Sequence, residues 1–285
     1  MKLHVGISTC PNDTYAFSGL LTGAVPTPGL ELELELCDVE ELNTRFAAGE
    51  FDVAKLSFAA MLQRAPELWV LPAGAALGYG VGPVVLARPG RAADAPLTPD
   101  KRVLAPGANT TATLLWQLFH AGEGQLDQAV FHAIMPALER GEADLGVCIH
   151  EGRFTYAEAG LTLVEDLGAT WEAAARSPLP LGGIAARRSL GRGTALRVAD
   201  ALRRSLAHAD ADPEATLPTM ARHAQDPSAA SCFEHVKLYV NAWTRDLGAP
   251  GGPEALAELS ARAAARGLAP SAGLEWLPFE APTSA

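Results

Sequence analysis

The sequence predicts an α/β fold with two lobes, mostly parallel sheets, flanking helices and a ligand cleft between the lobes. The chain has 285 residues, more than the ~100–200 of one compact domain, and 48% of them are hydrophobic, enough for a sizeable core. Runs typical of strands alternate with runs typical of helices, as in parallel sheets. A five-residue motif also recurs, which favours two lobes of similar build.

The first lobe is expected to begin with three strands and two helices. The strands are Lys2–Ser8, Leu30–Cys37 and Asp52–Leu56, and the helices begin near Asp13 and Val39. In the middle strand leucine alternates with glutamate, which is the two-residue period of a strand with one wet face. This strand is therefore expected near a sheet edge.

The second lobe is expected to repeat the pattern. Its strands are Lys101–Ala105 and Ala143–Ile149, with helices beginning near Asn109 and covering Met135–Arg140. The recurring motif marks the junction from a helix to an apolar strand in each lobe, at residues 49–53 (GEFDV) and 141–145 (GEADL). Chance, or convergence on a good helix-to-strand junction, is the alternative explanation of so short a repeat.

Two segments are expected to connect the lobes. Gly82–Arg88 leads out of the first lobe and Leu179–Arg187 leads back, so the first lobe comprises residues 1–90 and 188–285 and the second residues 91–187. Lobes joined twice form a hinge that can close on a ligand.

The last third of the chain is expected to be helical and to pack on the first lobe. Apolar residues recur at helical spacing in Thr194–Ala209, Pro213–Ala224, Ser228–Leu247 and Pro253–Gly267. The uncharged stretch Leu68–Ala87 could span a bilayer by length, but its glycines and prolines predict two buried strands joined by a glycine-rich loop.

Composition argues against several kinds of partner. With 33 acidic and 22 basic residues the formal charge is −11, which disfavours nucleic acid and anionic membranes as partners. The four cysteines are dispersed and no Cys or His spacing is typical of metal ligands, so no metal site is expected. No nucleotide-binding or esterase motif is present. The first residues lack a signal-peptide pattern, which favours the cytoplasm, and the oligomeric state stays open.

Four polar loops are expected to meet at the cleft, because ligands of open α/β sheets bind beyond the carboxyl ends of the strands. The loops are Ser8–Thr14, Lys55–Ser57, Pro106–Thr113 and Ile149–Glu151. The first and third precede helices and could offer backbone amides to an anion, although each alone also fits an ordinary helix cap.

His150 is the candidate catalytic residue, because an imidazole titrates near neutral pH and can accept a proton. A lone histidine at a strand end is more often structural, but its place at the cleft favours catalysis. Ser57 is expected to hydrogen-bond the ligand, and Lys55 either contacts the ligand or is solvated. Glu151 either orients the His150 ring or is solvated, and solvation is favoured. Arg45 either pairs with a ligand carboxylate or, more commonly for Arg, lies on the surface.

These loops resemble those of the 1,4-dihydroxy-6-naphthoate synthase family of the futalosine route to menaquinone. The resemblance runs in order over most of the chain, and its most specific part is the opening STCPNDT loop, residues 8–14. Further matching segments are Lys55–Ser57, Asn109–Ala112 and Ile149–Arg153.

The resemblance implies a periplasmic-binding-protein type II fold and a cofactor-free lyase acting on cyclic dehypoxanthine futalosine, a small-molecule substrate. It places the family's proton acceptor on His150. It places substrate contacts on Lys55, Leu56 and Ser57 and on Thr110 and Thr111. The remaining candidate substrate-binding residues, from the same loops, are Asn12, Asn109 and Ile149.

Two other functions remain as alternatives. Chorismate dehydratase shares the scaffold, but its family begins with a different first loop. A solute-binding protein of a transporter is a second alternative, disfavoured by the missing signal peptide and by His150.

Overall fold

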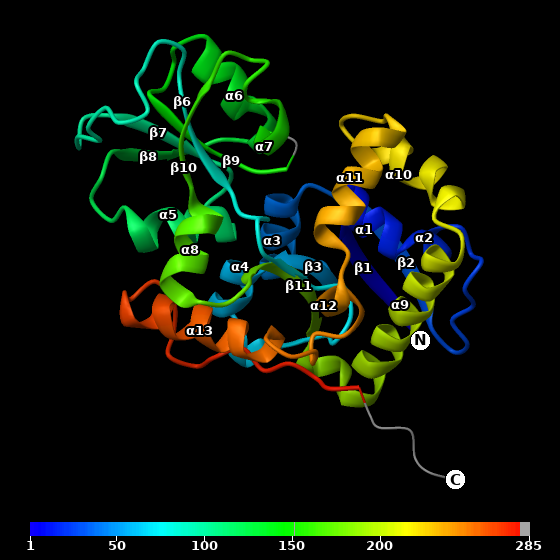
Figure 1. The fold of residues 1–285 in the computed structure, drawn as a ribbon. Helices are drawn as coiled ribbons and strands as arrows, with labels where there is room; N and C mark the ends of the chain where they lie inside the picture. The colour runs from blue at the N-terminus through cyan, green and yellow to red at the C-terminus, as the bar shows by residue number, and fades with distance from the viewer. Residues whose placement is uncertain (151, 280–285) are drawn as a thin grey trace.

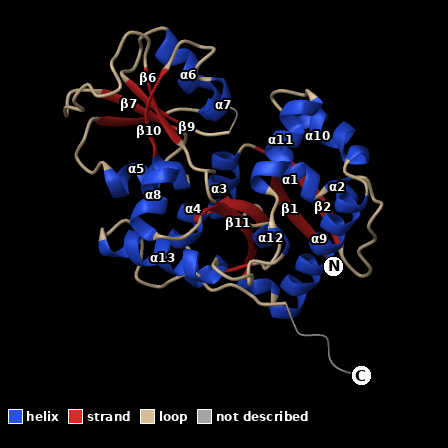
Figure 2. Ribbon diagram, in the orientation of Figure 1, coloured by secondary structure: helices blue, strands red, loops and turns tan. Residues whose placement is uncertain are grey.

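The two sheets of the molecule lie in separate lobes, each covered by helices (Figures 1 and 2). The computed structural model describes residues 1–150 and 152–279. The first sheet has the strand order β2-β1-β3-β11-β4, with β5 paired with β11. Its strands are β1 (Lys2–Ser8), β2 (Glu31–Cys37), β3 (Val53–Ser57), β4 (Leu68–Val70), β5 (Ala76–Gly78) and β11 (Leu179–Arg187).

The second sheet has the order β10-β6-β9-β7-β8. Its strands are β6 (Val84–Ala87), β7 (Arg102–Ala105), β8 (Gln125–Gln128), β9 (Leu145–Cys148) and β10 (Thr162–Asp166). The uncharged stretch 68–87 therefore forms three short strands, β4, β5 and β6, rather than the two expected.

Both sheets are mixed, which corrects the expectation of mostly parallel sheets. β1 is parallel to β2 and β3, and β7 is parallel to β8 and β9. The strands that enter from the other lobe, β6 and β11, are antiparallel to their neighbours. A parallel neighbour requires a crossover that returns the chain to the same end of the sheet, and these strands arrive without one.

β2 occupies an edge of the first sheet, as its alternating pattern predicts. Its glutamates lie on the wetter face, and its leucines are only half-buried because a single neighbouring strand and one helical layer cover them. Helix α3 (Val39–Ala48) follows at once, with the Asp38 side chain accepting from the Glu40 amide as its N-cap.

The segments expected to connect the lobes are themselves strands of the two sheets, so the actual connections are shorter than expected. β6 already pairs with β9 and β10, so the chain enters the second sheet before residue 90, and β11 belongs to the first sheet before residue 188. At the outward connection a Cβ on Gly82 would lie 2.2 Å from Cα of Gly168, so only glycine allows this close backbone approach.

Besides α3, helices of 4–9 residues follow the strands of both lobes. In the first lobe they are α1 (Pro11–Ala16), α2 (Ser18–Leu21) and α4 (Phe58–Gln63), with a 3₁₀ turn at Ala65–Glu67. In the second lobe they are α5 (Thr111–Phe119), α6 (Phe131–Glu139), α7 (Gly152–Thr155) and α8 (Leu167–Ala175).

The end of the chain is helical, and α9, α10 and α11 pack on α1 and α2 of the first lobe. The elements are α9 (Arg192–Ala211), α10 (Leu217–His223), α11 (Ala229–Tyr239), α12 (Ala242–Arg245) and α13 (Gly252–Ala265), with 3₁₀ turns at Arg188–Leu190 and Glu214–Thr216. The single helix expected at 228–247 is interrupted, because Val240 is extended and Asn241 caps a new helix through a capping box with Thr244.

The largest apolar cluster runs through both lobes. Phe58 of α4, Leu115 of α5 and Trp171 of α8 are buried in it together. The lobes are thus joined by a continuous core along the side where α4, α5, α8 and α13 lie (Figure 1). In the described part of the chain, no helix is long and apolar enough to cross a membrane.

Candidate active site

A cavity lies between the lobes and is lined by loops from both sheets. These loops follow β1, β3, β7 and β9, so the four loops selected from the sequence converge in space. All the candidate residues except Asn109 line this cavity, namely Asn12, Lys55, Leu56, Ser57, Thr110, Thr111, Ile149 and His150. Glu151, expected to be solvated, lies outside the described residues.

Lys55 is a buried cation with a buried partner. Its Nζ donates to Asp13 Oδ1 at 2.6 Å and to the Gly74 carbonyl at 3.2 Å, and the residue is only 6% exposed. The other Asp13 oxygen accepts from Ser8 Oγ at 2.5 Å, and Asn12 Nδ2 lies 3.1 Å from Oδ1. Of the two expectations for Lys55, solvation is wrong, and its charge is already balanced where it reaches the cavity.

Ser57 ends β3 and is held by Asn43 of α3, a residue that the sequence did not single out. The Ser57 amide donates to Asn43 Oδ1 at 3.0 Å, and Asn43 Nδ2 donates to Ser57 Oγ at 3.3 Å. Because Oγ accepts this bond, its own hydrogen can point to a ligand in the cavity.

Asn109 connects the lobes instead of lining the cavity. Its Nδ2 donates to Glu40 Oε1 at 2.7 Å, and its backbone amide also donates to the Glu40 carboxylate. Nearby Gly107 has φ +113 and lies against Glu40, so a side chain at this position would be strained and would also meet Glu40. The sequence placed this loop correctly but could not indicate that a carboxylate of the other lobe binds it.

The hydroxyls of Thr110 and Thr111 are used by the protein itself. Thr110 caps α5 by accepting from the Thr113 amide at 3.2 Å, and it donates to the Gly107 carbonyl at 2.9 Å. Thr111 donates to the Leu181 carbonyl of β11 at 2.7 Å. The amides of Thr111 and Ala112 begin α5 and have no acceptor within their helix, so they are the donors that this loop can offer to an anion.

His150 follows β9 with φ +56, a left-handed conformation that is uncommon for a residue other than glycine. Its Nδ1 lies 3.4 Å from Cys10 Sγ of the first lobe. Phe131 packs edge-on to the imidazole at a centroid distance of 4.9 Å. The left-handed turn aims the ring back across the cavity toward the first lobe.

Helix α11 supplies a wall of the site that the sequence analysis missed. Tyr239 lines the cavity, and the His235 ring lies parallel to that of His150 with centroids 6.2 Å apart. His235 and Tyr239 are four residues apart and so share one helix face, a spacing that could have drawn attention to them. Nothing local in the sequence shows that α11 reaches the cavity.

The Cys148 thiol, two residues before His150, does not line the cavity. Burial raises the pKa of the neighbouring Cys148 thiol to about 12, so it stays protonated. No group of three or more His, Cys, Asp or Glu side chains among residues 1–150 and 152–279 is placed to hold a metal ion.

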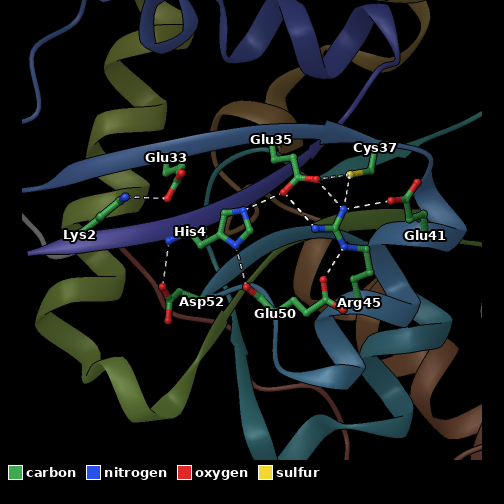
Figure 3. Close-up of polar contacts among 9 residues, drawn as sticks. All are labelled: Lys2, His4, Glu33, Glu35, Cys37, Glu41, Arg45, Glu50 and Asp52. Atoms are coloured by element: carbon green, nitrogen blue, oxygen red, sulfur yellow. Dashed lines mark hydrogen bonds and ion pairs between the residues drawn. The ribbon is translucent and has the colours of Figure 1, made fainter.

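Arg45 does not line the cavity but lies at the centre of a carboxylate cluster at the sheet edge (Figure 3). Its guanidinium donates to Glu35 at 2.6 Å, to Glu50 at 2.7 Å and to Glu41 at 3.0 Å. The hydrogen bonds from Arg45 hold the pKa of Glu35 at about 2. Of the two expectations for Arg45, the surface one agrees with the structure.

The two lobes with a cavity between them form a fold of the periplasmic-binding-protein type. A Candida albicans protein described as having the generic periplasmic binding protein fold matches with a TM-score of 0.69 at 10% identity, covering 100% of this chain and 99% of that one. A ligand-binding component of an import system from Staphylococcus aureus matches with a TM-score of 0.72 at 12% identity, covering 100% of both chains. These likenesses show the fold alone. The chain itself belongs to the menaquinone biosynthesis family, whose model matches residues 3–265.

Relatives with higher identity agree with this assignment. A 1,4-dihydroxy-6-naphthoate synthase of Streptomyces coelicolor is 42% identical over 97% of this chain and 98% of its own. Another synthase of this name, from Thermus thermophilus, is 45% identical over 94% of this chain and 96% of its own. A crystal structure of a protein from Archaeoglobus fulgidus has a TM-score of 0.86 at 31% identity, over 94% of this chain and 98% of that chain.

Proposed function

We propose that this protein is a 1,4-dihydroxy-6-naphthoate synthase, a lyase that converts cyclic dehypoxanthine futalosine to 1,4-dihydroxy-6-naphthoate in menaquinone biosynthesis. The observation that carries the proposal is the similarity to two synthases at 42% and 45% identity over nearly the full length of both partners. The cavity supports it, because it brings an imidazole, hydroxyls and helix amides together around one space between the lobes.

In the proposed reaction His150 acts as the general base. It removes a proton that a neighbouring carbonyl of the substrate makes acidic, and the bond to the sugar-derived fragment then breaks as the aromatic product forms. His150 is suited to this role because it faces the first lobe across the cavity.

The developing oxyanion is received by donors from both lobes. Ser57 is the strongest candidate donor, because Asn43 donates to its oxygen and leaves the hydroxyl hydrogen for the ligand. The Thr110 and Thr111 hydroxyls donate to carbonyls of the protein, so that loop contributes through the first amides of α5. Lys55, with Asp13 as its partner, fixes the floor of the cavity without adding net charge.

The test is direct. Purified protein is incubated with cyclic dehypoxanthine futalosine, without added cofactor, while the dihydroxynaphthoate is followed by chromatography. Wild type and a His208→Ala control, whose imidazole is exposed on α9, should form product. His150→Ala should lose ~10²–10⁴-fold in kcat, as expected for a missing general base.

Three other outcomes would change the proposal. Binding of the compound without turnover by wild type would favour a solute-binding protein. Conversion of chorismate instead would favour the dehydratase. Near-normal turnover by a folded His150→Ala variant would show that His150 is not the general base, while the proposed reaction would still hold.

We further propose that the enzyme works in the cytoplasm. Cys10, Cys37 and Cys148 are thiols rather than disulfides, as expected in a reducing compartment. Fractionation of the source cells, followed by immunodetection of the protein, tests this.

A further inference from the structure

Arg153 is a largely buried cation that joins α7 to the segment entering the second lobe. Its Nη1 donates to the Gly82 carbonyl at 2.6 Å, and its Nη2 donates to Asp166 Oδ2 at 2.6 Å. The side chain is only 17% exposed. The guanidinium therefore binds two separate segments at once, and the reaction proposed above gives this residue no part.

The two acceptors of Arg153 are fixed relative to each other. Asp166 Oδ1 accepts from the Gly168 and Ala169 amides as the N-cap of α8. Gly82 packs so closely on this helix that a Cβ on it would lie 2.2 Å from the Gly168 Cα. Both acceptors thus belong to one rigid junction between the outward connection and α8, and Gly82 also lines the cavity.

The other end of Arg153 is bonded to the backbone of His150. The Arg153 amide donates to the His150 carbonyl at 3.2 Å. The His150 backbone is left-handed, with φ +56, and such a conformation persists in a residue other than glycine where surrounding contacts impose it. Because the Arg153 main chain holds the His150 carbonyl while its side chain is anchored on the junction, it opposes relaxation of this backbone.

The direction of the imidazole depends on that backbone. Phe131 packs edge-on to the ring at a centroid distance of 4.9 Å, and the His235 ring lies parallel to it at 6.2 Å. Cys10 Sγ approaches from the first lobe. These are contacts of the ring, whereas Arg153 acts on the main chain. A change to a right-handed backbone would turn the His150 side chain away from all three neighbours.

We propose that Arg153 is a positioning residue for the general base: by binding the Gly82 carbonyl and the Asp166 carboxylate together, it maintains the left-handed backbone that aims the His150 ring into the cavity. A guanidinium suits this task because its planar fork presents several donors in fixed directions and stays charged. The inference rests on the proposed function, in which His150 removes a proton from the substrate.

The kinetic test compares Arg153→Ala and Arg153→Lys with Arg140→Ala, which removes an arginine paired with Glu142 on the surface of the same lobe. Arg153→Ala should lower kcat by ~10²-fold, because a displacement of about 1 Å at a reacting group can cost that much. KM should stay nearly unchanged, because the substrate contacts expected in the first lobe are untouched.

The other two variants define what the loss means. Arg153→Lys keeps a cation beside Asp166 but cannot reproduce the fork, so its kcat should lie between those of wild type and Arg153→Ala. Arg140→Ala should match wild type. Wild-type kcat in either folded Arg153 variant would overturn the proposal, and so would an equal loss of kcat in Arg140→Ala.

Added guanidinium ion separates a positioning role from damage to the fold. In Arg153→Ala the free ion can enter the space beside the Gly82 carbonyl and Asp166, so guanidinium chloride, at concentrations too low to unfold the protein, should restore part of kcat. Sodium chloride at the same ionic strength should not, and guanidinium should not raise the kcat of His150→Ala. No recovery, together with a melting temperature lowered relative to Arg140→Ala, would show that Arg153 merely stabilises the fold and would overturn the proposal.

A further measurement does not depend on turnover. The ¹H–¹³C NMR signal of the His150 imidazole, assigned by its loss in His150→Ala, should be displaced in wild type by the ring current of Phe131. In Arg153→Ala it should move toward the position of an exposed histidine. An unmoved signal would refute the positioning role whether or not the naphthoate is formed. Absence of product from wild type, with the expected movement, would instead refute the proposed reaction alone.

Discussion

At the residue scale, Ser57 and Asn43 show how a donor can be kept ready for an anion. Asn43 uses both ends of its amide on Ser57, and it is itself buried in the first lobe. The hydroxyl is thus oriented before the ligand arrives, which is what stabilisation of a developing charge requires.

Ser57→Ala should therefore reduce kcat by ~10²-fold, with a smaller effect on KM, because an oxyanion donor acts mainly in the transition state. Steady-state kinetics with the naphthoate product as readout measure this, and the melting temperature checks that the Asn43 contact has not collapsed. A change in KM alone would show that Ser57 binds the substrate without stabilising the transition state.

The buried pair of Asp13 and Lys55 allows a second prediction. Asp13→Asn leaves the Lys55 ammonium without its carboxylate, which should cost ~3–5 kcal/mol in the free energy of unfolding. Asp13→Asn with Lys55→Met removes both charges and should recover part of that loss. Urea titrations of the three proteins measure it, and equal destabilisation of the single and double variants would contradict it.

At the element scale, β2 and α3 are joined on the solvent side by the carboxylates around Arg45 (Figure 3). The pKa of Glu35 is about 2, below its ordinary 4.5, chiefly because Arg45 donates to it. A carboxyl with a depressed pKa stabilises the fold fully above its unfolded value. That stabilisation is lost as the pH falls through the folded value.

Glu35→Gln should therefore flatten the fall in stability between about pH 5 and about pH 3. Urea unfolding at several pH values in that window measures this, and added salt should weaken the effect because the pair is partly exposed. Glu67→Gln, whose carboxylate pairs with Arg64 on the surface, is the matched control. Parallel pH curves for wild type and Glu35→Gln would contradict the prediction.

The same elements show how much could be predicted from the sequence. Local patterns are enough to predict that β2 lies at the sheet edge and that the loops after β1, β3, β7 and β9 form the site, because periodicity and strand ends are local properties. They do not suffice for the antiparallel entry of β6 and β11, or for the arrival of α11 at the cavity, because these depend on contacts between distant segments. Asn43, Asp13 and His235 were missed for the same reason.

At the scale of the whole molecule, the two sides of the lobe interface differ in chemistry. On one side Phe58, Leu115 and Trp171 belong to one continuous apolar core. On the other side, the backbone and side-chain amides of Asn109 in the second lobe donate hydrogen bonds to the Glu40 carboxylate in the first. Separating the apolar side would expose a large buried surface, whereas polar partners can exchange their bonds for water. Opening of the lobes is therefore expected to break the polar contacts and to use the apolar side as the hinge.

Asn109→Ala should shift the lobes toward an open state while leaving the global fold intact, because it removes the side-chain amide that donates to the Glu40 carboxylate at 2.7 Å and leaves only the weaker backbone bond. The radius of gyration from solution X-ray scattering should rise without ligand and return to the wild-type value when substrate analogue is bound. KM should rise by ~5–10-fold, as expected when ligand binding must also drive closure. Glu41→Ala is the control. Glu41 lies beside Glu40 on α3 but pairs with Arg45, so its loss should change neither the radius of gyration nor KM. If Asn109→Ala and wild type scatter identically with and without ligand, the Glu40 contact does not govern closure, and the apolar core alone holds the lobes together.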